Sequence, residues 1–383
     1  MTRAFLAAAG VLAALAANLQ AEAGGAAPKA AEFRFAPKPA ETVRHRISLK
    51  SVGTISLAPG LPGARFTQNT TQEIAARCRE VRPDGSAVVD MELTRIATRM
   101  NTAGLLVDYD STTFDAEKEQ SPMVRLIGKV YSALIGSKLT VTFNRHGSPI
   151  QVTGMKEAVN KAIEPVRQEL GNDAAGRSAG QLIDGITTMF DDATMTDQLK
   201  SFYRFVPDKT RPVAVGEKWQ HDWTMSLAVL DVTCDAKGEY ELLSYETFRG
   251  RPCARIGIKE TFEMSSKKAA KPRPAAQTAP GLGRLLQNMD LSLSASGGTG
   301  MACWDYQTGV LVQLQQTQNI TIDVRFKNRP SASASAPADS MPADEGPTGS
   351  LSQKFVTSVQ IDLLDDEGNP AMSRPAGAEP AKP

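Results

Sequence analysis

The sequence predicts an α+β fold that is mainly antiparallel β, with two β-rich halves joined by a helical segment. Segments such as Arg65–Val81 and Ser86–Thr98 alternate apolar and polar residues with a period of two, which is typical of strands with one buried face. The turn residues Pro83-Asp84-Gly85 separate these two segments. Between the halves, apolar residues recur at helical spacing. We therefore expect a curved sheet, or an open half-barrel, packed on helices.

The first residues have the features of an export signal. Arg3 precedes an uninterrupted apolar run, Ala4–Ala17, and Ala21-Glu22-Ala23 supplies a cleavage pattern. The apolar run is shorter than the roughly 20 residues that a membrane-spanning helix needs. We expect a signal peptide over residues 1–23, and an exported, periplasmic or extracellular protein without a transmembrane helix in the mature chain. An uncleaved anchor is the less favoured alternative.

The N-terminal β-rich half is predicted over residues 32–154, after a linker over residues 24–31. It contains a predicted helix over residues 121–135, because Ser121-Pro122 supplies an N-cap and a proline suited to the first helical position, and Gly136 is a natural end. The strands expected around this helix are Thr42–Lys50, Arg65–Val81, Ser86–Thr98 and, as a strand, turn and strand, Lys138–Val152.

Residues 155–206 are predicted to be the helical segment that joins the halves. Apolar stripes at helical spacing, such as Val159, Ile163 and Val166, indicate helices in this part of the chain. These helices are rich in Met, Leu and Ile, so they could cover an apolar groove or simply fill the core.

The C-terminal β-rich half is predicted over residues 207–327, and a final strand over residues 351–366. Within this half we expect strands over Thr224–Asp235 and Tyr240–Thr247, joined by a turn at Lys237-Gly238, because glycine is typical of turns. Regular alternation of apolar and polar residues indicates further strands toward residue 326.

Three segments of low complexity are predicted to be disordered: residues 265–283, 328–350 and 367–383. None can bury enough apolar surface to offset the conformational entropy lost on ordering. The first carries four basic residues and no acidic one, so it could dock on an anionic partner, although a solvated loop is the favoured alternative.

Charge and cysteine content exclude several classes of function. The formal net charge is +1 and aromatic residues make up 6% of the chain, so we expect no binding of nucleic acid. An oxidising compartment would allow disulfides, but buried free thiols are equally compatible with the sequence. The sequence contains no C-x-x-C pair, so neither a redox motif nor a zinc motif is indicated. The cysteines are Cys78, Cys234, Cys253 and Cys303, and their pairing is left open.

No pattern of catalytic, metal-binding or cofactor-binding residues is present in the sequence. The three histidines, His45, His146 and His221, are far apart and do not have the spacing of metal ligands. Neither a G-x-S-x-G nucleophile elbow nor a glycine-rich phosphate loop occurs. We therefore expect a non-enzymatic protein without cofactors. An enzyme would require a polar cleft that holds His221 beside a carboxylate.

The stretch Pro212–Trp223 is the most distinctive part of the sequence. It holds two of the three tryptophans, Trp219 and Trp223, with His221 between them. In a continuous strand these three residues share one face, and Gly216 marks a bend before them. We predict that the two tryptophans anchor the sheet to the core, with a buried, hydrogen-bonded His221 rather than a catalytic one.

Several motifs resemble an exported bacterial family of unknown function, whose β-rich domain carries a Val-x-Val-Gly-Asp-x-Trp element. The matching pieces are Val213–Trp219, which includes Gly216, the opening Phe33-Arg34-Phe35, Asn144–Gly154, and the closing turn that runs from Trp304 to Gly309. The resemblance covers about residues 32–326 and implies that Gly216, Trp219, Trp223, Trp304 and Gly309 are a structural signature. It implies no activity and no catalytic residues.

The layout alone is similar to that of exported bacterial lipoprotein and lipid carriers, in which a concave sheet holds acyl chains. Fold does not dictate function, so this analogy is weaker than a motif. Our leading hypothesis is a non-catalytic binding or carrier module for an apolar ligand. The alternatives are a structural or protein-interaction module of the cell envelope and, less favoured, a hydrolase.

Overall fold

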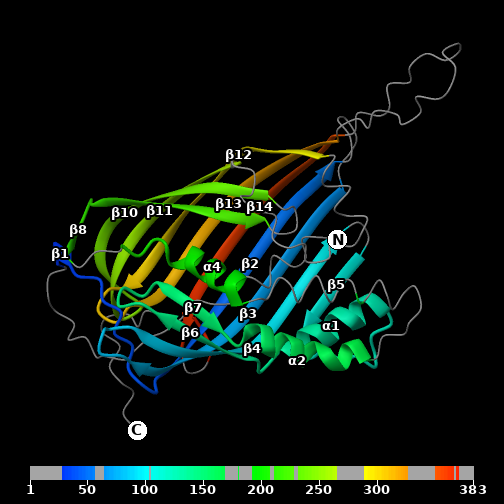
Figure 1. Ribbon diagram of the computed structural model, residues 1–383, viewed down its shortest axis with the longest axis horizontal. Helices are drawn as coiled ribbons and strands as arrows, with labels where there is room; N and C mark the ends of the chain where they lie inside the picture. Colours follow the sequence, from blue (N-terminus) through cyan, green and yellow to red (C-terminus); the bar gives the residue numbers. More distant parts are fainter. Residues whose placement is uncertain are drawn as a thin grey trace, which may run out of the picture.

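A single antiparallel sheet dominates the computed structural model of the protein (Figure 1). The structure describes residues 28–56, 64–102, 105–168, 180, 192–207, 211–227, 232–264, 289–326, 350–365 and 368–370. The predicted fold class is confirmed, because the structure is mostly antiparallel β with few helices. The predicted signal peptide with Ala21 and Ala23, the insertion 265–283, residues 328–349 and residues 371–383 lie outside the described residues.

The elements have the following bounds. The strands are β1 (Ala30–Ala31), β2 (Thr42–Ser56), β3 (Ala64–Val81), β4 (Ala87–Thr102), β5 (Leu105–Asp110), β6 (Lys138–Phe143), β7 (Pro149–Thr153), β8 (Val213–Ala214), β9 (Lys218–Leu227), β10 (Val232–Phe248), β11 (Arg251–Met264), β12 (Met289–Asp305), β13 (Val310–Phe326) and β14 (Ser350–Leu364). The helices are α1 (Pro122–Leu134), α2 (Met155–Gln168) and α4 (Asp192–Tyr203). The last two residues of the expected linker thus form β1, which pairs with β8.

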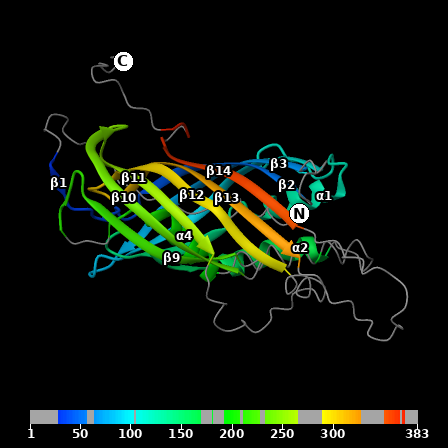
Figure 2. The same cartoon turned by 90° about the horizontal axis from the view of Figure 1, so that it is seen from above.

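The two β-rich halves expected from the sequence form one 12-stranded sheet. Its strand order is β7-β6-β4-β3-β2-β14-β13-β12-β11-β10-β9, with β5 added beside β4. The last strand, β14, joins the halves because β2 pairs along one of its edges and β13 along the other. Figure 2 shows β10 to β14 running side by side along the length of the molecule. The sheet stays open, since β7 and β9 end the path without pairing with each other.

The helices lie on one face of the sheet, which we call the inner face. Figure 1 shows α4 across this face, with α1 and α2 together near β4 and β5. The side chain of Ser121 accepts a hydrogen bond from the backbone N–H of Val124, so Ser121 caps α1 as the sequence predicts. The hydroxyl of Thr196 in α4 accepts a hydrogen bond from Val152 N at 2.9 Å, which ties α4 to β7. Among the helices that the structure describes, none has the length and apolar character needed to cross a membrane.

Trp304 lies at the centre of the core, with 0% of its surface exposed. Two aromatic residues from the end of α4 and the turn after it pack edge-on against its ring, with centroid distances of 6.0 Å for Tyr203 and 5.7 Å for Phe205. Tyr203 also contacts Phe143 of β6 at 5.6 Å, and Phe143 contacts Phe35 at 5.0 Å. This aromatic chain joins β12, the end of α4 and β6 in one core.

The opening segment that contains Phe33-Arg34-Phe35, which resembles an opening strand of the family, does not form a strand. It is extended, but its backbone bonds to two turns instead of to a neighbouring strand. Arg34 N donates to Tyr306 O at 3.1 Å, Phe35 N to Arg145 O at 3.3 Å and Ala36 N to Thr308 O at 3.1 Å. The turn between β6 and β7 and the turn between β12 and β13 provide all three acceptors, so the segment bridges these two turns without joining a β ladder.

The predicted turn at Lys237-Gly238 is also wrong. Strand β10 runs without interruption through this dipeptide, where Gly238 is opposite His221 of β9 and Glu260 of β11. A Cβ atom on Gly238 would lie 2.2 Å from the hydroxyl oxygen of Tyr240. Gly238 therefore marks a close approach within a strand, which is the other common role of a strand glycine.

Two signature glycines should respond differently to substitution by alanine. Gly309 has φ 77°, and an added Cβ would lie 2.7 Å from Phe35 Cα, whereas Gly216 has φ 85° with no atom within 4 Å. We expect Gly216→Ala to lower the free energy of unfolding by about 1 kcal/mol, through backbone strain alone. Gly309→Ala adds the steric clash and should cost about 3 kcal/mol or more. Urea denaturation measures both, and equal costs would contradict the close packing of Phe35 on this turn.

The pH dependence of stability should report on His45, a fully buried residue of β2. Its Nε2 lies 2.7 Å from Leu311 O, which assigns the proton to Nε2, and burial lowers its pKa from 6.5 to about 4. Because the unfolded chain takes up the proton first, stability falls as the pH drops from 6.5 toward 4, by up to about 3 kcal/mol. Chemical denaturation across this range should show the loss in the wild type. His45→Gln should remove that part of the slope, and an unchanged slope would rule out His45 as its source.

Candidate functional site

A row of polar and glycine residues crosses the apolar inner face of the sheet. The strand register places its members directly opposite one another, and opposite residues point to the same face. On one side the row is bordered by Phe262, Phe355 and Phe66, and on the other by Ile258 and Val359, all buried. The row runs from β9 to β3 through His221, Gly238, Glu260, Gly298, Gln318, Thr357, Ser51 and Gln68.

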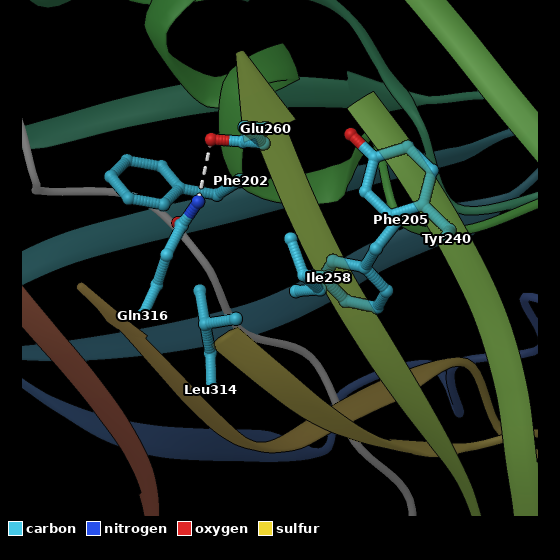
Figure 3. Close-up of a pocket in the computed structure, with 7 residues that line it drawn as sticks. All are labelled: Phe202, Phe205, Tyr240, Ile258, Glu260, Leu314 and Gln316. Carbon is cyan, nitrogen blue, oxygen red and sulfur yellow. Dashed lines mark hydrogen bonds between the residues drawn. The ribbon is translucent and has the colours of Figure 1, made fainter. Parts of the chain in front are cut away.

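A small pocket lies where this row meets α4 (Figure 3). Its volume of about 10 Å³ is enough for roughly one water molecule. Phe202 of α4 and Phe205, two residues beyond the helix, form one side of it, and strands β10, β11 and β13 form the other. The strand residues that line it are Tyr240, Ile258, Glu260, Leu314 and Gln316.

Among the described residues that line this pocket, Glu260 is the only acidic one, and 6% of its surface is exposed. Its Oε2 accepts hydrogen bonds from the side-chain amides of Gln316 at 2.6 Å and Gln318 at 3.2 Å. Burial raises the pKa of Glu260, although the nearby charge of Arg204 and the two amides act in the opposite direction. The site therefore holds a carboxylate whose charged form is disfavoured by its surroundings.

Two hydrogen-bond donors on the inner face of β9 and β10 are buried and have no acceptor among the residues that the structure describes. They are the hydroxyl of Tyr240, a residue with 2% of its surface exposed, and the indole Nε1 of Trp223. The Tyr240 hydroxyl lies over Gly238, which is opposite Glu260. Burial raises the pKa of Tyr240, so the hydroxyl keeps its proton. Buried donors without partners are costly, so each calls for an explanation, such as a ligand or water that accepts from it.

Arg204 adds a positive charge to this part of the inner face. Its guanidinium carbon lies 3.8 Å from the centroid of the Trp223 ring, a cation–π contact. Burial lowers the pKa of Arg204 to about 10, so it is still charged at neutral pH. Within the described part of the chain, no ion pair or hydrogen bond of this guanidinium is found.

The residues singled out in Pro212–Trp223 lie beside this pocket. As the spacing predicts, Trp219, His221 and Trp223 share the inner face, opposite Tyr240, Gly238 and Ala236. Trp219 is buried and stacks on Tyr240 at a centroid distance of 6.1 Å, whereas His221 and Trp223 are half-buried. Strand β10 separates His221 from Glu260, so two strand spacings, about 10 Å, lie between their backbones.

The other predicted residues lie elsewhere. Trp304 and Gly309 belong to the core junction with Phe35, and Gly216 lies in the turn before β9. All four cysteines are buried and carry free thiols, which is one of the two states that the sequence allowed. Burial raises the pKa of Cys234 and of Cys303 to about 11. Among the described residues, no group of His, Cys, Asp or Glu side chains could hold a metal ion.

Sequence reasoning missed Arg204, Tyr240 and Glu260. One signal could have indicated Glu260, because it interrupts an alternating series of apolar residues, Ala254, Ile256, Ile258 and Phe262, on the buried face of β11. No comparable signal exists for Arg204, which lies just after a helix. Only the packing of that segment on the sheet brings Arg204 over Trp223.

Comparisons with known proteins identify a family for this chain but indicate no activity. A model described as a family of unknown function (DUF6263) matches residues 84–279, just over half of the chain. This confirms the resemblance to a family of unknown function. No curated protein matches the chain.

Three solved structures are similar to the chain at low levels. A structure of lipid–protein interactions in lipovitellin has a TM-score of 0.36 at 10% identity over 90% of this chain, which spans only 26% of that chain. DynF from the dynemicin biosynthesis pathway of Micromonospora chersina has a TM-score of 0.18 at 9% identity, covering 94% of this chain and 97% of that one. OpdQ of Pseudomonas aeruginosa has a TM-score of 0.18 at 6% identity, covering 85% of this chain and 100% of that one. These scores are too low to support an argument about function.

Measurements of the free energy of unfolding can test whether Trp219 anchors the sheet to the core. Because Trp219 is 7% exposed and stacks on Tyr240, Trp219→Ala should lower the free energy of unfolding by about 3–5 kcal/mol. Gln220→Ala is the matched control, since Gln220 is exposed on the opposite face of the same strand, and it should change stability by less than about 0.5 kcal/mol. Urea denaturation compares the two variants. A cost below about 1 kcal/mol for Trp219→Ala would show that this side chain does not anchor the sheet.

Proposed function

We propose that this chain, which belongs to the family of unknown function DUF6263, is a non-catalytic binding or carrier module for an apolar ligand. The observation that carries the proposal is the pocket beneath Phe202 and Phe205. Its walls are mostly apolar, while the unpartnered hydroxyl of Tyr240 and the carboxyl of Glu260 converge on it. Apolar walls with a few converging polar groups are typical of sites for small molecules.

The size of the pocket implies that a ligand enters by displacing part of the protein. A volume of about 10 Å³ is far below that of an acyl chain or any other sizeable apolar molecule. Phe202 and Phe205 occupy the space that such a ligand would need, and both belong to the end of one short helix and its exit. The described arrangement is thus the closed state of the proposed binding site, and a ligand would favour an open state.

The polar groups of the site are poorly arranged for catalysis. His221 and Glu260 are separated by a whole strand, too far apart for direct proton transfer between them. The raised pKa values of the cysteine thiols disfavour the thiolate, which is the form that acts as a nucleophile. These features support binding over turnover.

We further propose that the protein is exported to the periplasm or the cell exterior. The support is the sequence of its first residues, Arg3, the apolar run Ala4–Ala17 and the Ala21-Glu22-Ala23 pattern. Mass spectrometry of the protein recovered from fractionated cells should find a mature chain that starts near Gly24. Recovery of the uncleaved chain from the cytoplasm would contradict export.

Filling the pocket should abolish binding of an apolar molecule. Leu314 lines the pocket, so Leu314→Trp places an indole in the space that the ligand needs. Leu243→Trp is the matched control, because Leu243 is exposed and packs over Gly257 on the outer face. With Nile red, a neutral apolar probe, we expect affinity to fall at least about tenfold for Leu314→Trp and to stay unchanged for Leu243→Trp.

Mass spectrometry of the protein purified without detergent provides an independent test, because a carrier should retain apolar molecules from its host. The proposal fails if no apolar molecule co-purifies and Nile red binds the wild type no better than Leu314→Trp. Thermal unfolding of both variants shows whether a loss of binding reflects a loss of fold.

A further inference from the structure

Three groups with hydrogens to donate gather on the inner face where β9 and β10 meet the exit of α4. They are the hydroxyl of Tyr240, Nε1 of Trp223 and the guanidinium of Arg204. The hydroxyl and the indole nitrogen are buried and have no acceptor in the described part of the molecule. The guanidinium stacks on the Trp223 ring at 3.8 Å. We call these three residues the donor cluster.

The register shows that the donor cluster is compact. Trp223 is opposite Ala236, and Tyr240 directs its hydroxyl back along β10 over Gly238, the next residue of that strand on the same face. The hydroxyl therefore lies on the Trp223 side of the Tyr240 backbone. Arg204 is close enough to Tyr240 and to Glu260 for the charges of these groups to influence its pKa.

Two acidic residues, Glu260 of β11 and Asp197 of α4, lie near enough to influence the pKa of Arg204. The Oε2 atom of Glu260 accepts the amides of Gln316 and Gln318, and no hydrogen bond or ion pair from either carboxylate to Arg204 is found among the described residues. The donor cluster is thus complementary to an acceptor with negative charge that comes from outside the protein.

We infer that the donor cluster binds the carboxylate of an amphiphilic ligand, a long-chain carboxylic acid, whose apolar chain occupies the adjoining pocket. This inference rests on the proposed function and assigns the chemical class of the ligand. The two oxygens of a carboxylate match the paired N–H groups of one guanidinium, and one oxygen remains able to accept from the Tyr240 hydroxyl. The apolar chain would lie between Ile258 and Leu314, in place of Phe202 and Phe205.

A carboxylate suits the charge of the site better than a phosphate. The donor cluster carries a single positive charge, that of Arg204, which one carboxylate would neutralise. A phosphate monoester carries between one and two charges at neutral pH and would leave part of that charge unpaired. A neutral alcohol of the same chain length would leave the guanidinium unpaired.

The first test uses the wild-type protein and ligands that differ only in the head group. Dodecanoic acid, dodecan-1-ol and dodecyl phosphate are compared by displacement of Nile red at neutral pH. We expect the acid to bind at least about tenfold more tightly than the alcohol, and more tightly than the phosphate. Equal affinity for acid and alcohol overturns the carboxylate site but leaves the proposed function intact. Tighter binding of the phosphate overturns the carboxylate assignment.

The second test removes the donors one at a time. Arg204→Gln should weaken binding of the acid about tenfold or more and leave the alcohol almost unchanged, and Tyr240→Phe should weaken the acid about threefold to tenfold. Arg211→Gln is the control for loss of charge, since Arg211 is exposed and pairs with Glu217 at the surface. Equal effects of Arg204→Gln and Arg211→Gln on binding of the acid would overturn the inference. Failure of all three ligands to bind the wild type would overturn the proposed function as well.

Discussion

The burial of the Trp304 indole is the interaction on which the rest of this structure depends. Trp304 belongs to β12, yet its ring packs against Tyr203 and Phe205, which follow from the helical segment. Tyr203 continues the contact to Phe143 on β6, near the far edge of the sheet. One aromatic junction thus connects strands from both halves of the chain to the exit of α4.

This junction also determines what the candidate site contains. Tyr203 and Phe205 are anchored on Trp304. Phe202, the residue before Tyr203, therefore lies at the pocket. Arg204, the residue after Tyr203, lies over the ring of Trp223. The proposed displacement of Phe202 and Phe205 would break the contact of Phe205 with Trp304 but keep that of Tyr203, and the sheet would stay folded because its own ladder of hydrogen bonds holds it together. The proposed displacement by a ligand therefore involves few residues, all near the end of α4.

The row of polar and glycine residues shows how an apolar sheet face can carry a buried carboxylate at an acceptable cost in stability. A buried carboxylate is unfavourable unless hydrogen bonds compensate for lost hydration. Gln316 and Gln318 supply such bonds to Glu260, and the backbone at Gly238 leaves room for the Tyr240 hydroxyl. The donors on Arg204, Tyr240 and Trp223 stay uncompensated among the described residues. Their convergence beside the pocket is the physical basis for placing the ligand there.

The sequence by itself determined the fold class, the helix capped by Ser121 and the shared face of Trp219, His221 and Trp223, because these follow from local periodicity and capping chemistry. It misjudged Gly238 and Phe35, whose conformations depend on contacts with residues distant in the chain or on an adjacent hydroxyl. Only the tertiary structure decided that β14 pairs with both β2 and β13 and merges two halves into one sheet. It also decided that Arg204, Trp223, Tyr240 and Glu260 form one site. The physical reason is that strand order and the path of a helix exit depend on long-range packing, which leaves no periodic signal in a single sequence.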